Sequence, residues 1–388
     1  MITWQSNRLL NELLNVMNEV QKKIKVAYVL GALNRGGTES LILDICRNYD
    51  TAPFDMVCVY RKEGNLSEEF HKTKVKMLCL PCGNMLSYIW QLRQLLQNEQ
   101  IDIVHSQTPS NTAVLGMALL GTKMKLLTSF HGHSFAHANY FIRKWVYFIS
   151  RKIICVSKNQ KQYYEKHWCL PNVNKLEVVH NGIDTGKIVG IDYVMPDFLI
   201  KKDKNEITFA VVGSFGSGRS QEFLLRVINQ EKTKLIDKKV KIYFVGGAFN
   251  GEESIYQTCE QYIRQHQIDS IAIMLGVRKD VLAILQHVDG FLYATKTDTF
   301  GIAVVEAMLS GVPVIVNDFV VMKEISQDGE LATLYKSNDI DDCADKILAF
   351  VDNVGQYKQR AKSQVHRISE LYSIDNHINN LSNIYKEL

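Results

Sequence analysis

Several features that would place the chain in a special class are absent from its 388 residues. No run approaches the ~20 apolar residues that a helix needs to cross a bilayer, and the longest, Thr112–Gly121, predicts a core helix. The N-terminus lacks the charged start, apolar core and cleavage site of a signal peptide. Eight cysteines in a chain of this length do not make a disulfide framework. We therefore expect a protein of the reducing cytoplasm.

A strong charge of either sign is also missing. The chain has 45 Lys and Arg against 41 Asp and Glu, a formal net charge of +4. This balance excludes a dedicated nucleic-acid binder, which shows a larger and clustered basic excess, but it is compatible with an anionic membrane surface. Hydrophobic residues make up 46% and charged residues 22%, which is ordinary for a folded globular protein. No repeat of roughly 20–50 residues is present.

The residues that most often bind structural metals do not occur at metal-binding spacings. Cys79 and Cys82 form a C-x-x-C, but no second pair and no spaced histidine pair accompanies them, so we do not expect zinc. Because the pair follows an apolar run and contains Pro81, it predicts a strand end and turn rather than a redox motif. The one D-x-D, Asp339-Ile-Asp341, predicts a helix cap.

The order of the apolar segments predicts an α/β protein. After Lys25–Leu30, β-rich runs alternate with helix-like stretches, and the alternation restarts after residue 185. Such alternation is typical of parallel βαβ units in doubly wound sheets. The further strand candidates are Asp55–Tyr60, Lys76–Leu80, Asp102–His105, Lys125–Phe130, Lys152–Val156, Leu176–His180, Glu206–Val212, Val240–Val245, Ile271–Leu275, Gly290–Tyr293 and Pro313–Val316. We expect two domains with a ligand cleft between them.

Two other segments lie at the borders of these domains. Residues 4–24 predict an amphipathic helix, because apolar side chains recur there at three- and four-residue steps. Residues 186–205 lack periodicity and contain Pro196 and the charge run Lys201–Lys204. We therefore place the linker between the domains in this second segment.

A glycine-rich loop, Gly213–Ser220, follows one strand candidate and precedes the helical stretch Gln221–Ile228. Free N–H groups and a helix N-terminus at such a place suit a phosphate. The loop nearly matches the P-loop pattern, with Arg219 at the lysine position, so a P-loop nucleotide hydrolase is one alternative. Against it, Val240–Val245 runs into two glycines rather than into a magnesium-binding aspartate. A plain strand-to-helix turn is the other alternative.

Asp298 and Glu306 are the most informative pair of residues. Asp298 follows the strand candidate Gly290–Tyr293, at the sheet edge where ligands bind in open α/β folds. The next residues, Thr299–Gly301, are expected to open a helix and offer N–H groups to an anion. Glu306 is flanked by Ala and Val, which predicts a partly buried carboxylate, and vicinal sugar hydroxyls supply the two donors it needs. The alternative is an ordinary helical acid with internal partners.

From about residue 25 to 388, ordered motifs resemble glycosyltransferase family 4, the retaining enzymes of the GT-B fold. The motifs are Asn34-Arg-Gly36-Gly37-Thr-Glu39, Val104–Ser106, Ser129–Gly132, Cys155–Ser157, His180–Asp184, the loop at 213, Asp298-x7-Glu306, Gly311–Ile315 and the segment Tyr372 to Tyr385. The resemblance implies two Rossmann-like doubly wound domains that face each other across a cleft. The implied bounds are an extension at 1–24, an acceptor domain at 25–190, a donor domain at 191–370 and a last helix at 371–388 that crosses back.

The resemblance also implies an activity. A sugar would pass from a nucleotide-sugar, with UDP favoured over GDP, to an acceptor hydroxyl in the assembly of cell-surface polysaccharide or glycolipid. It implies catalytic roles for His131, Asp298 and Glu306, with Glu306 on the donor ribose and Asp298 on the transferred sugar. Donor-binding roles are implied for Gly36, Gly37, Gly213, Ser214, Arg219, Phe300, Gly301 and Glu306. No metal or other cofactor is implied.

Two departures from the family pattern affect these expectations. Ser214 stands where the family has arginine and Arg219 where it has lysine, so the donor diphosphate loses one usual cation. The candidates to replace it are Arg278, Lys279 and Lys296. Asp298 replaces a glutamate and shortens the reach of the carboxylate by one methylene. Together they raise a third hypothesis, a GT-B protein that binds a partner and does no chemistry.

Two more features concern the acceptor side. We interpret His105 as a structural strand-end residue, and His131 as functional because of the resemblance. The stretch Tyr140–Lys152 interleaves aromatic and basic residues, which is typical of an interfacial helix on an anionic membrane. A core helix with a solvated basic edge is the alternative. We hypothesise a lipid-linked acceptor and a peripheral position on the inner face of the cell membrane.

Overall fold

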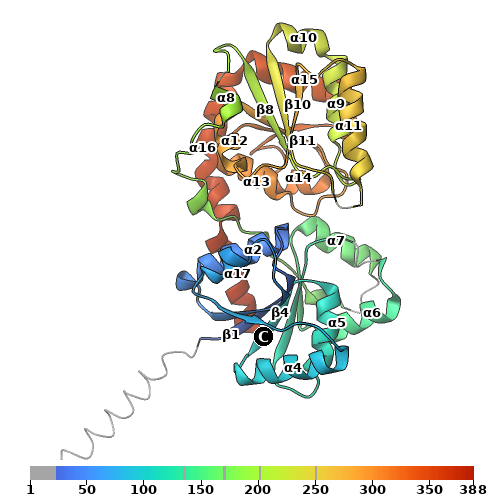
Figure 1. Cartoon of the computed structure of the whole chain (residues 1–388), viewed down its shortest axis with the longest axis vertical. Coiled ribbons are helices and arrows are strands. Elements are labelled where there is room, and N and C mark those ends of the chain that lie inside the picture. Colours follow the sequence, from blue (N-terminus) through green and yellow to red (C-terminus); the bar gives the residue numbers. More distant parts are fainter. Residues whose placement is uncertain (1–22, 134–136, 169–171, 201, 250) are drawn as a thin grey trace, which may run out of the picture.

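The computed structural model describes residues 23–133, 137–168, 172–200, 202–249 and 251–388. Most of the helix predicted for residues 4–24 therefore lies outside the described residues. The described chain forms two parallel sheets, one after the other in sequence, each flanked by helices (Figure 1). The α/β prediction is confirmed.

The first sheet contains seven parallel strands in the order β3-β2-β1-β4-β5-β6-β7. Central strand β1 pairs with β2 and β4 on its two sides, and its residues Val26–Leu30 are buried. The strands are β1 Lys25–Ala32, β2 Asp55–Lys62, β3 Lys76–Cys79, β4 Ile103–Ser106, β5 Lys125–Phe130, β6 Lys152–Cys155 and β7 Leu176–Val178. The helices are α2 Gly37–Arg47, α3 Ser67–His71, α4 Met85–Asn98, α5 Pro109–Ala118, α6 Tyr140–Ile149 and α7 Lys158–His167.

The second sheet contains six parallel strands in the order β10-β9-β8-β11-β12-β13. The strands are β8 Ile207–Val212, β9 Val240–Val245, β10 Ala272–Gly276, β11 Gly290–Tyr293, β12 Val314–Asn317 and β13 Thr333–Tyr335. The helices are α8 Asp197–Ile200, α9 Gln221–Gln230, α10 Lys232–Asp237, α11 Glu253–Gln265, α12 Val281–His287, α13 Ile302–Leu309, α14 Val320–Ile325, α15 Ile340–Asp352 and α16 Val354–Tyr372. The N-cap of α15 is Asp339, whose side chain accepts from the Asp342 N–H at 3.0 Å, as predicted.

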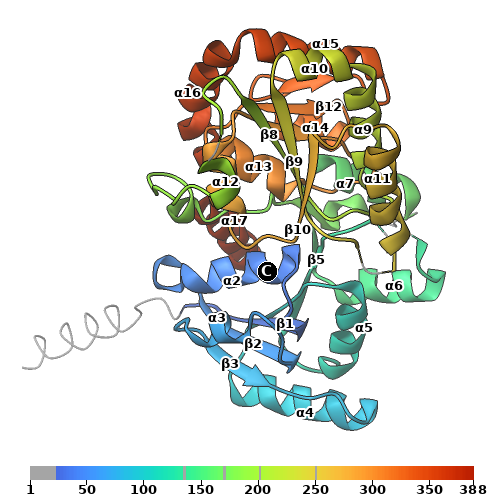
Figure 2. The same cartoon turned by 45° about the horizontal axis from the view of Figure 1, so that its top comes forward.

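The end of the chain joins the two sheets. Helix α16 ends at Tyr372, and α17 (Ile374–Glu387) packs into the core of the first sheet through Ile374, Ile378 and Leu381. Figures 1 and 2 show α17 beside α2, with α16 leading back from it to the second sheet. We use "N-terminal unit" for the first sheet with α2–α7 and α17, and "C-terminal unit" for the second sheet with α8–α16.

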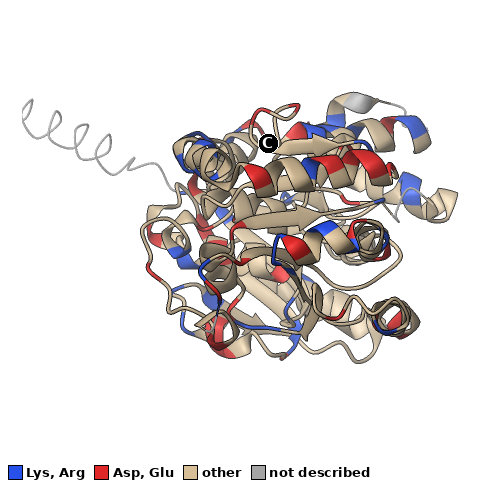
Figure 3. Cartoon of the chain, turned by 90° about the horizontal axis from the view of Figure 1, so that it is seen from above, with Lys and Arg blue, Asp and Glu red and all other residues tan. Residues whose placement is uncertain are grey.

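The surface of the molecule carries both signs of charge. Lys and Arg alternate with Asp and Glu along the helices when the chain is seen from above (Figure 3), which fits the small net charge of +4. In the part of the chain that the structure describes, no helix is both long and apolar enough to span a bilayer.

Candidate functional site

A cleft of about 700 Å³ lies between the two units. It is lined from the N-terminal unit by α2 and its preceding loop, and from the C-terminal unit by the ends of β8 and β10 and by α12 and α13. Its charged lining residues are Arg35, Asp44, Arg47, Glu69, Asp184, Lys187, Arg278, Lys279 and Glu306. The lining includes Glu306, for which the resemblance implies a site role, and the candidate cations Arg278 and Lys279.

The Glu306 carboxylate has no hydrogen-bond or ion-pair partner among the described residues, and only part of its side chain reaches solvent. Burial, followed by the charge of Asp44, raises its pKa from 4.5 to about 7, although Lys187 opposes the shift. An unpartnered carboxylate in such surroundings is held at a cost, because it has lost water without gaining donors. A ligand that brings two hydroxyl donors removes that cost.

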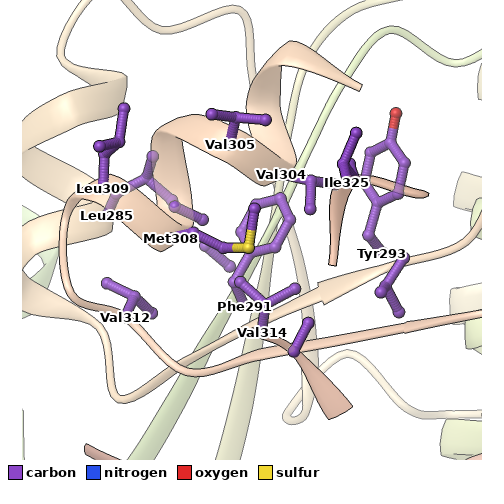
Figure 4. Packing of buried hydrophobic residues seen from close by; sticks show 14 of the residues in the cluster. Leu285, Phe291, Tyr293, Val304, Val305, Met308, Leu309, Val312, Val314 and Ile325 are labelled. Atoms are coloured by element: carbon purple, nitrogen blue, oxygen red, sulfur yellow. The ribbon is translucent and has the colours of Figure 1, made fainter. Parts of the chain in front are cut away.

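The position of Glu306 follows from the packing of its helix. Val304, Val305, Met308 and Leu309 of α13 are buried in one hydrophobic cluster with residues of the strands β11 and β12. Figure 4 shows Val304 and Met308 between the helix and Phe291, whereas Val305 lies on the side of α13 that faces away from Phe291 and Val314. Glu306 lies between the two apolar pairs in sequence, so its side chain leaves the helix on another face and enters the cleft.

Asp298 is already paired in this structure. Its Oδ2 accepts from the Tyr293 hydroxyl at 2.6 Å and from the Arg219 guanidinium, while its Oδ1 accepts from the Thr299 N–H at 3.0 Å. The Arg219 guanidinium also lies 5.1 Å from the centroid of the Tyr293 ring. Asp298, the predicted sugar-binding acid, and Arg219, the predicted phosphate-binding cation, therefore form an ion pair close to the end of β11.

His131 lies in the loop after β5 and contacts both units. Its Nε2 lies 2.9 Å from the Gln107 Oε1, and its carbonyl oxygen accepts from the Thr299 hydroxyl at 2.9 Å. Burial, followed by the charge of His377, lowers the His131 pKa to about 4, so the ring is neutral near pH 7. As predicted, His105 is structural: it is buried, with its ring nitrogens 2.7 Å from the Tyr385 and Ser129 hydroxyls.

The start of α2 lies close to the start of α13 across the units. A Cβ atom on Gly37 would lie 3.4 Å from Ile302 Cδ1, so the start of α2 approaches the start of α13. Gly301 has a φ of +91°, a conformation that strains any residue with a Cβ. Phe300, just before it, is buried and packs near His180. The loop before α13 thus meets the N-terminal unit at the start of α2 and at His131, although none of these residues is part of the cleft lining.

The Gly213–Ser220 loop does not form a phosphate cradle of the P-loop kind. The backbone N–H of Phe215 donates to Gly247 at 2.9 Å, that of Ser217 to Glu252 at 2.7 Å, and that of Ser220 to Ala294 at 3.1 Å. These bonds use the N–H groups that a P-loop turns toward its ligand, so the geometry gives the hydrolase alternative no support. Donor-binding roles for Gly213, Ser214 and Arg219 stay predictions.

The three cations proposed to replace the missing arginine are placed differently. Arg278 and Lys279 line the Glu306 cleft, whereas Lys296 lines a separate pocket with Ser220 and Asn317. Arg278 makes two bonds to Asp280, at 2.8 and 2.6 Å. Lys279 is exposed and has no ion pair within the described residues. Lys279 is therefore the cation most available to an anionic ligand.

Sequence reasoning missed several residues at this site. Lys187 binds Asp44 and lies 3.4 Å from Asp184, and all three line the cleft. The pattern His180–Asp184 pointed to Asp184, but nothing in the local sequence marked Asp44 or Lys187, because their contact joins residues from α2 and from the loop after β7. Gln107, which contacts His131, was likewise unmarked.

The family models divide the chain as the two sheets do. The model described as Glycosyltransferase Family 4 matches residues 35–187, and the model described as Glycosyl transferases group 1 matches residues 197–366. Similar curated proteins include the UDP-Gal:alpha-D-GlcNAc-diphosphoundecaprenol alpha-1,3-galactosyltransferase of Escherichia coli. It is 23% identical over 363 residues, which are 87% of this chain and 90% of that protein. The O-antigen biosynthesis glycosyltransferase WclY of Escherichia coli is 22% identical over 78% of this chain and 82% of its own.

Solved structures share the fold. HepE of Anabaena, crystallised with UDP, superposes with a TM-score of 0.79 at 16% identity and covers 94% of this chain and 100% of its own. A glycosyltransferase of Rickettsia africae superposes with a TM-score of 0.80 at 18% identity, covering 94% of this chain and 98% of its own. At these identities the likeness concerns the fold.

Proposed function

Since the chain belongs to glycosyltransferase family 4 and has the GT-B fold, we propose that it transfers a hexose from a UDP-sugar. The acceptor is a hydroxyl of a saccharide or lipid-linked saccharide, in cell-surface polysaccharide or glycolipid assembly. The proposed transfer retains the anomeric configuration and needs no metal. The names of the Escherichia coli relatives and the UDP in HepE support the class of donor and acceptor.

One observation carries the proposal: the unpartnered carboxylate of Glu306 in the cleft between the units. Vicinal hydroxyls of a ribose are matched to such a group, because each can donate to one carboxylate oxygen. The protein supplies no donor of its own among the described residues. A buried glutamate with a purely structural role is expected to accept a hydrogen bond from the protein. The unpartnered carboxylate of Glu306 therefore favours a ligand-binding role over that of an ordinary helical acid with internal partners.

The other charged groups support a diphosphate beside that ribose. Lys279 and Arg278 line the same cleft, and a cation near the leaving phosphate stabilises the charge that develops as the glycosidic bond breaks. The His131 ring is neutral near pH 7, so we assign it a hydrogen-bonding role toward the transferred sugar rather than the role of a charged acid. If Asp298 accepts a hydrogen bond from a sugar hydroxyl, it does so while it also accepts one from the Arg219 guanidinium.

The proposal of metal independence has its own support. The one D-x-D of the sequence begins with Asp339, whose carboxylate caps α15, and neither aspartate lines the cleft. Cationic side chains at the cleft would take the place that a divalent cation holds elsewhere.

Helix α6 supports a lipid-linked acceptor and contact with an anionic membrane. Figure 1 shows α6 at the outer edge of the N-terminal unit. Phe141 is 77% exposed and Phe148 63%, whereas a core helix would bury them. Lys144 Nζ lies 4.5 Å from the centroid of the Tyr140 ring, so a cation accompanies the exposed rings. Exposed aromatic and basic side chains on one helix suit the boundary of an anionic bilayer.

Thermal unfolding with a panel of ligands tests the proposed function: UDP, GDP, ADP, ATP with magnesium, and several UDP- and GDP-sugars. A ligand at 100 times its Kd stabilises by about 2.7 kcal/mol, which shifts Tm by a few degrees. We expect UDP and one or more UDP-sugars to shift Tm without magnesium, and Glu306→Ala to abolish the shift. A response to ATP with magnesium alone would favour the hydrolase alternative, and no response to any ligand would favour a non-catalytic GT-B protein.

A further inference from the structure

One carboxylate of the C-terminal unit is held entirely by the N-terminal unit. Glu324 lies near the end of α14, and its Oε1 accepts from the backbone N–H of Lys158 at 2.7 Å. Its Oε2 accepts from the backbone N–H of Asn159 at 3.0 Å. These are the first two residues of α7. The first N–H groups of a helix have no partner within it and carry partial positive charge, so a carboxylate there makes charge-assisted bonds.

A third partner completes the contact. The Nε2 of His180, in the loop after β7, lies 2.7 Å from the same Oε1 of Glu324. The Glu324 side chain is only 11% exposed. Burial alone would raise its pKa, but the bonds from His180 and the two backbone N–H groups outweigh burial, and the pKa is lowered. The carboxylate is therefore a buried, charged and fully partnered bridge between the units.

This bridge lies directly under the predicted catalytic loop. A Cβ atom on Gly301 would lie 2.8 Å from the Cε of Met322 and 3.4 Å from the Cδ1 of Ile325, so two apolar side chains of α14, on either side of Glu324 in sequence, pack against the loop. The ring of His180 also lies 5.9 Å from that of Phe300, measured between centroids. A movement of α14 away from α7 would thus carry the 298–301 loop away from His131.

We propose that Glu324 is a positioning residue that fixes the two units in the arrangement where His131 meets the 298–301 loop. Glu324 does not line the cleft, so it acts through the spacing of the units and not by contact with a donor. Without it, the cleft opens, and the fraction of molecules competent to bind a nucleotide across both units falls. The ligand-binding part of this inference rests on the proposed function, whereas the spacing of the units does not.

Small-angle X-ray scattering of the full chain without ligand, together with calorimetric titration of UDP, tests this role. Glu324→Gln keeps the size of the side chain but turns an NH₂ group toward a backbone N–H donor. We expect a larger radius of gyration than in the wild type. We also expect the Kd for UDP to rise roughly tenfold or more, because apparent affinity scales with the competent fraction. Glu324→Asp, which keeps the charge, should recover part of both.

The matched control is Glu330→Gln. The Glu330 side chain is 61% exposed and pairs with Arg367 inside the C-terminal unit, so both measurements should match the wild type. A Glu324→Gln protein with the wild-type radius of gyration and wild-type UDP affinity would overturn the inference. If the wild type binds no UDP, the proposed function fails, and the scattering result alone decides the role of Glu324. Should Glu324→Gln not fold, His180→Phe keeps the ring packing, removes one of the three bonds and is judged by the same two measurements.

Discussion

The Thr299 hydroxyl donates a hydrogen bond of 2.9 Å to the carbonyl oxygen of His131, across 168 positions of sequence. This bond joins the loop before α13 in the C-terminal unit to the loop after β5 in the N-terminal unit. Both loops follow the carboxyl end of a parallel strand, where open α/β sheets bind their ligands. The two predicted halves of the reacting centre therefore face each other.

The raised pKa of Glu306 predicts a pH dependence of nucleotide binding. In the proposed donor site, ribose hydroxyls would donate to the ionised Glu306 carboxylate, so UDP would have to displace the proton that the group binds below pH 7. For each pH unit below the pKa, the affinity for UDP then falls by a factor that approaches ten. We expect UDP affinity to fall about tenfold between pH 8 and pH 6, by calorimetry. Glu306→Gln should bind weakly at both values, and a pH-independent wild-type affinity would contradict the assignment.

The same shift predicts an effect on stability in the absence of ligand. The folded chain binds the Glu306 proton more tightly than the unfolded chain does, because the pKa rises from 4.5 to about 7 on folding. Ionisation of Glu306 therefore lowers stability as pH rises from about 4.5 through 7, and the whole loss is present above pH 7. We expect Glu306→Gln to have a higher Tm than the wild type at pH 8 and an equal Tm near pH 4. A lower Tm at pH 8 would show that the carboxylate has partners in the folded chain.

The free cation of the cleft gives a second test of the donor site. Lys279→Ala should weaken UDP binding about tenfold, because a charge-assisted bond to phosphate contributes roughly 1.5–3 kcal/mol. The control is Lys296→Ala, which lies in a separate pocket and should leave the Kd unchanged. Equal effects of the two substitutions would mean that Lys279 acts only through the overall charge.

The Arg219–Asp298 pair predicts coupled effects on stability. Asp298→Asn removes the charged partner of the Arg219 guanidinium, and the Arg219 side chain is only 28% exposed. We expect this variant to have a free energy of unfolding lower by about 2 kcal/mol. Arg219→Met should have a similar effect, and the double variant should cost less than the sum of the two. Urea unfolding measures all three variants. Strict additivity would show that the two side chains do not interact in solution.

The exposed rings of α6 predict binding to vesicles. The double substitution Phe141→Ser and Phe148→Ser should abolish sedimentation with vesicles of anionic lipid at low salt. Leu86→Ser on α4, which removes a side chain that is 79% exposed elsewhere, should sediment as the wild type does. Wild-type protein that stays in the supernatant at low salt would contradict the membrane proposal.

The sequence predicted the elements that depend on local pattern. Apolar β-rich runs marked most strands, and the Asp339 cap followed from residue type and position alone. Strand β13 was missed, since the three residues Thr333–Tyr335 are too few to show a period. The predicted linker contains Leu199, which is buried in the same hydrophobic cluster as the residues of β11. A segment without hydrophobic periodicity can still bury a single side chain, and the sequence pattern does not show it.

The site was predictable as a set of motifs but not as a set of contacts. Spacing and flanking residues marked Glu306 as a partly buried acid, and the structure places it in the cleft. The bond between Arg219 and Asp298 joins residues 79 positions apart, and the bonds of Glu324 join two units. Such pairings depend on how the sheets dock, which no local pattern encodes.

Calorimetric titration of UDP into the wild type and into Glu306→Gln, at pH 8 and without metal, tests the central claim most directly. Glutamine keeps the shape of the side chain but replaces one acceptor oxygen with an NH₂ donor, so two ribose hydroxyls can no longer both donate to it. The account predicts saturable wild-type binding of one UDP and a loss of affinity of about a hundredfold in the variant, as expected for two charge-assisted bonds. Equal affinities in the two proteins would contradict it.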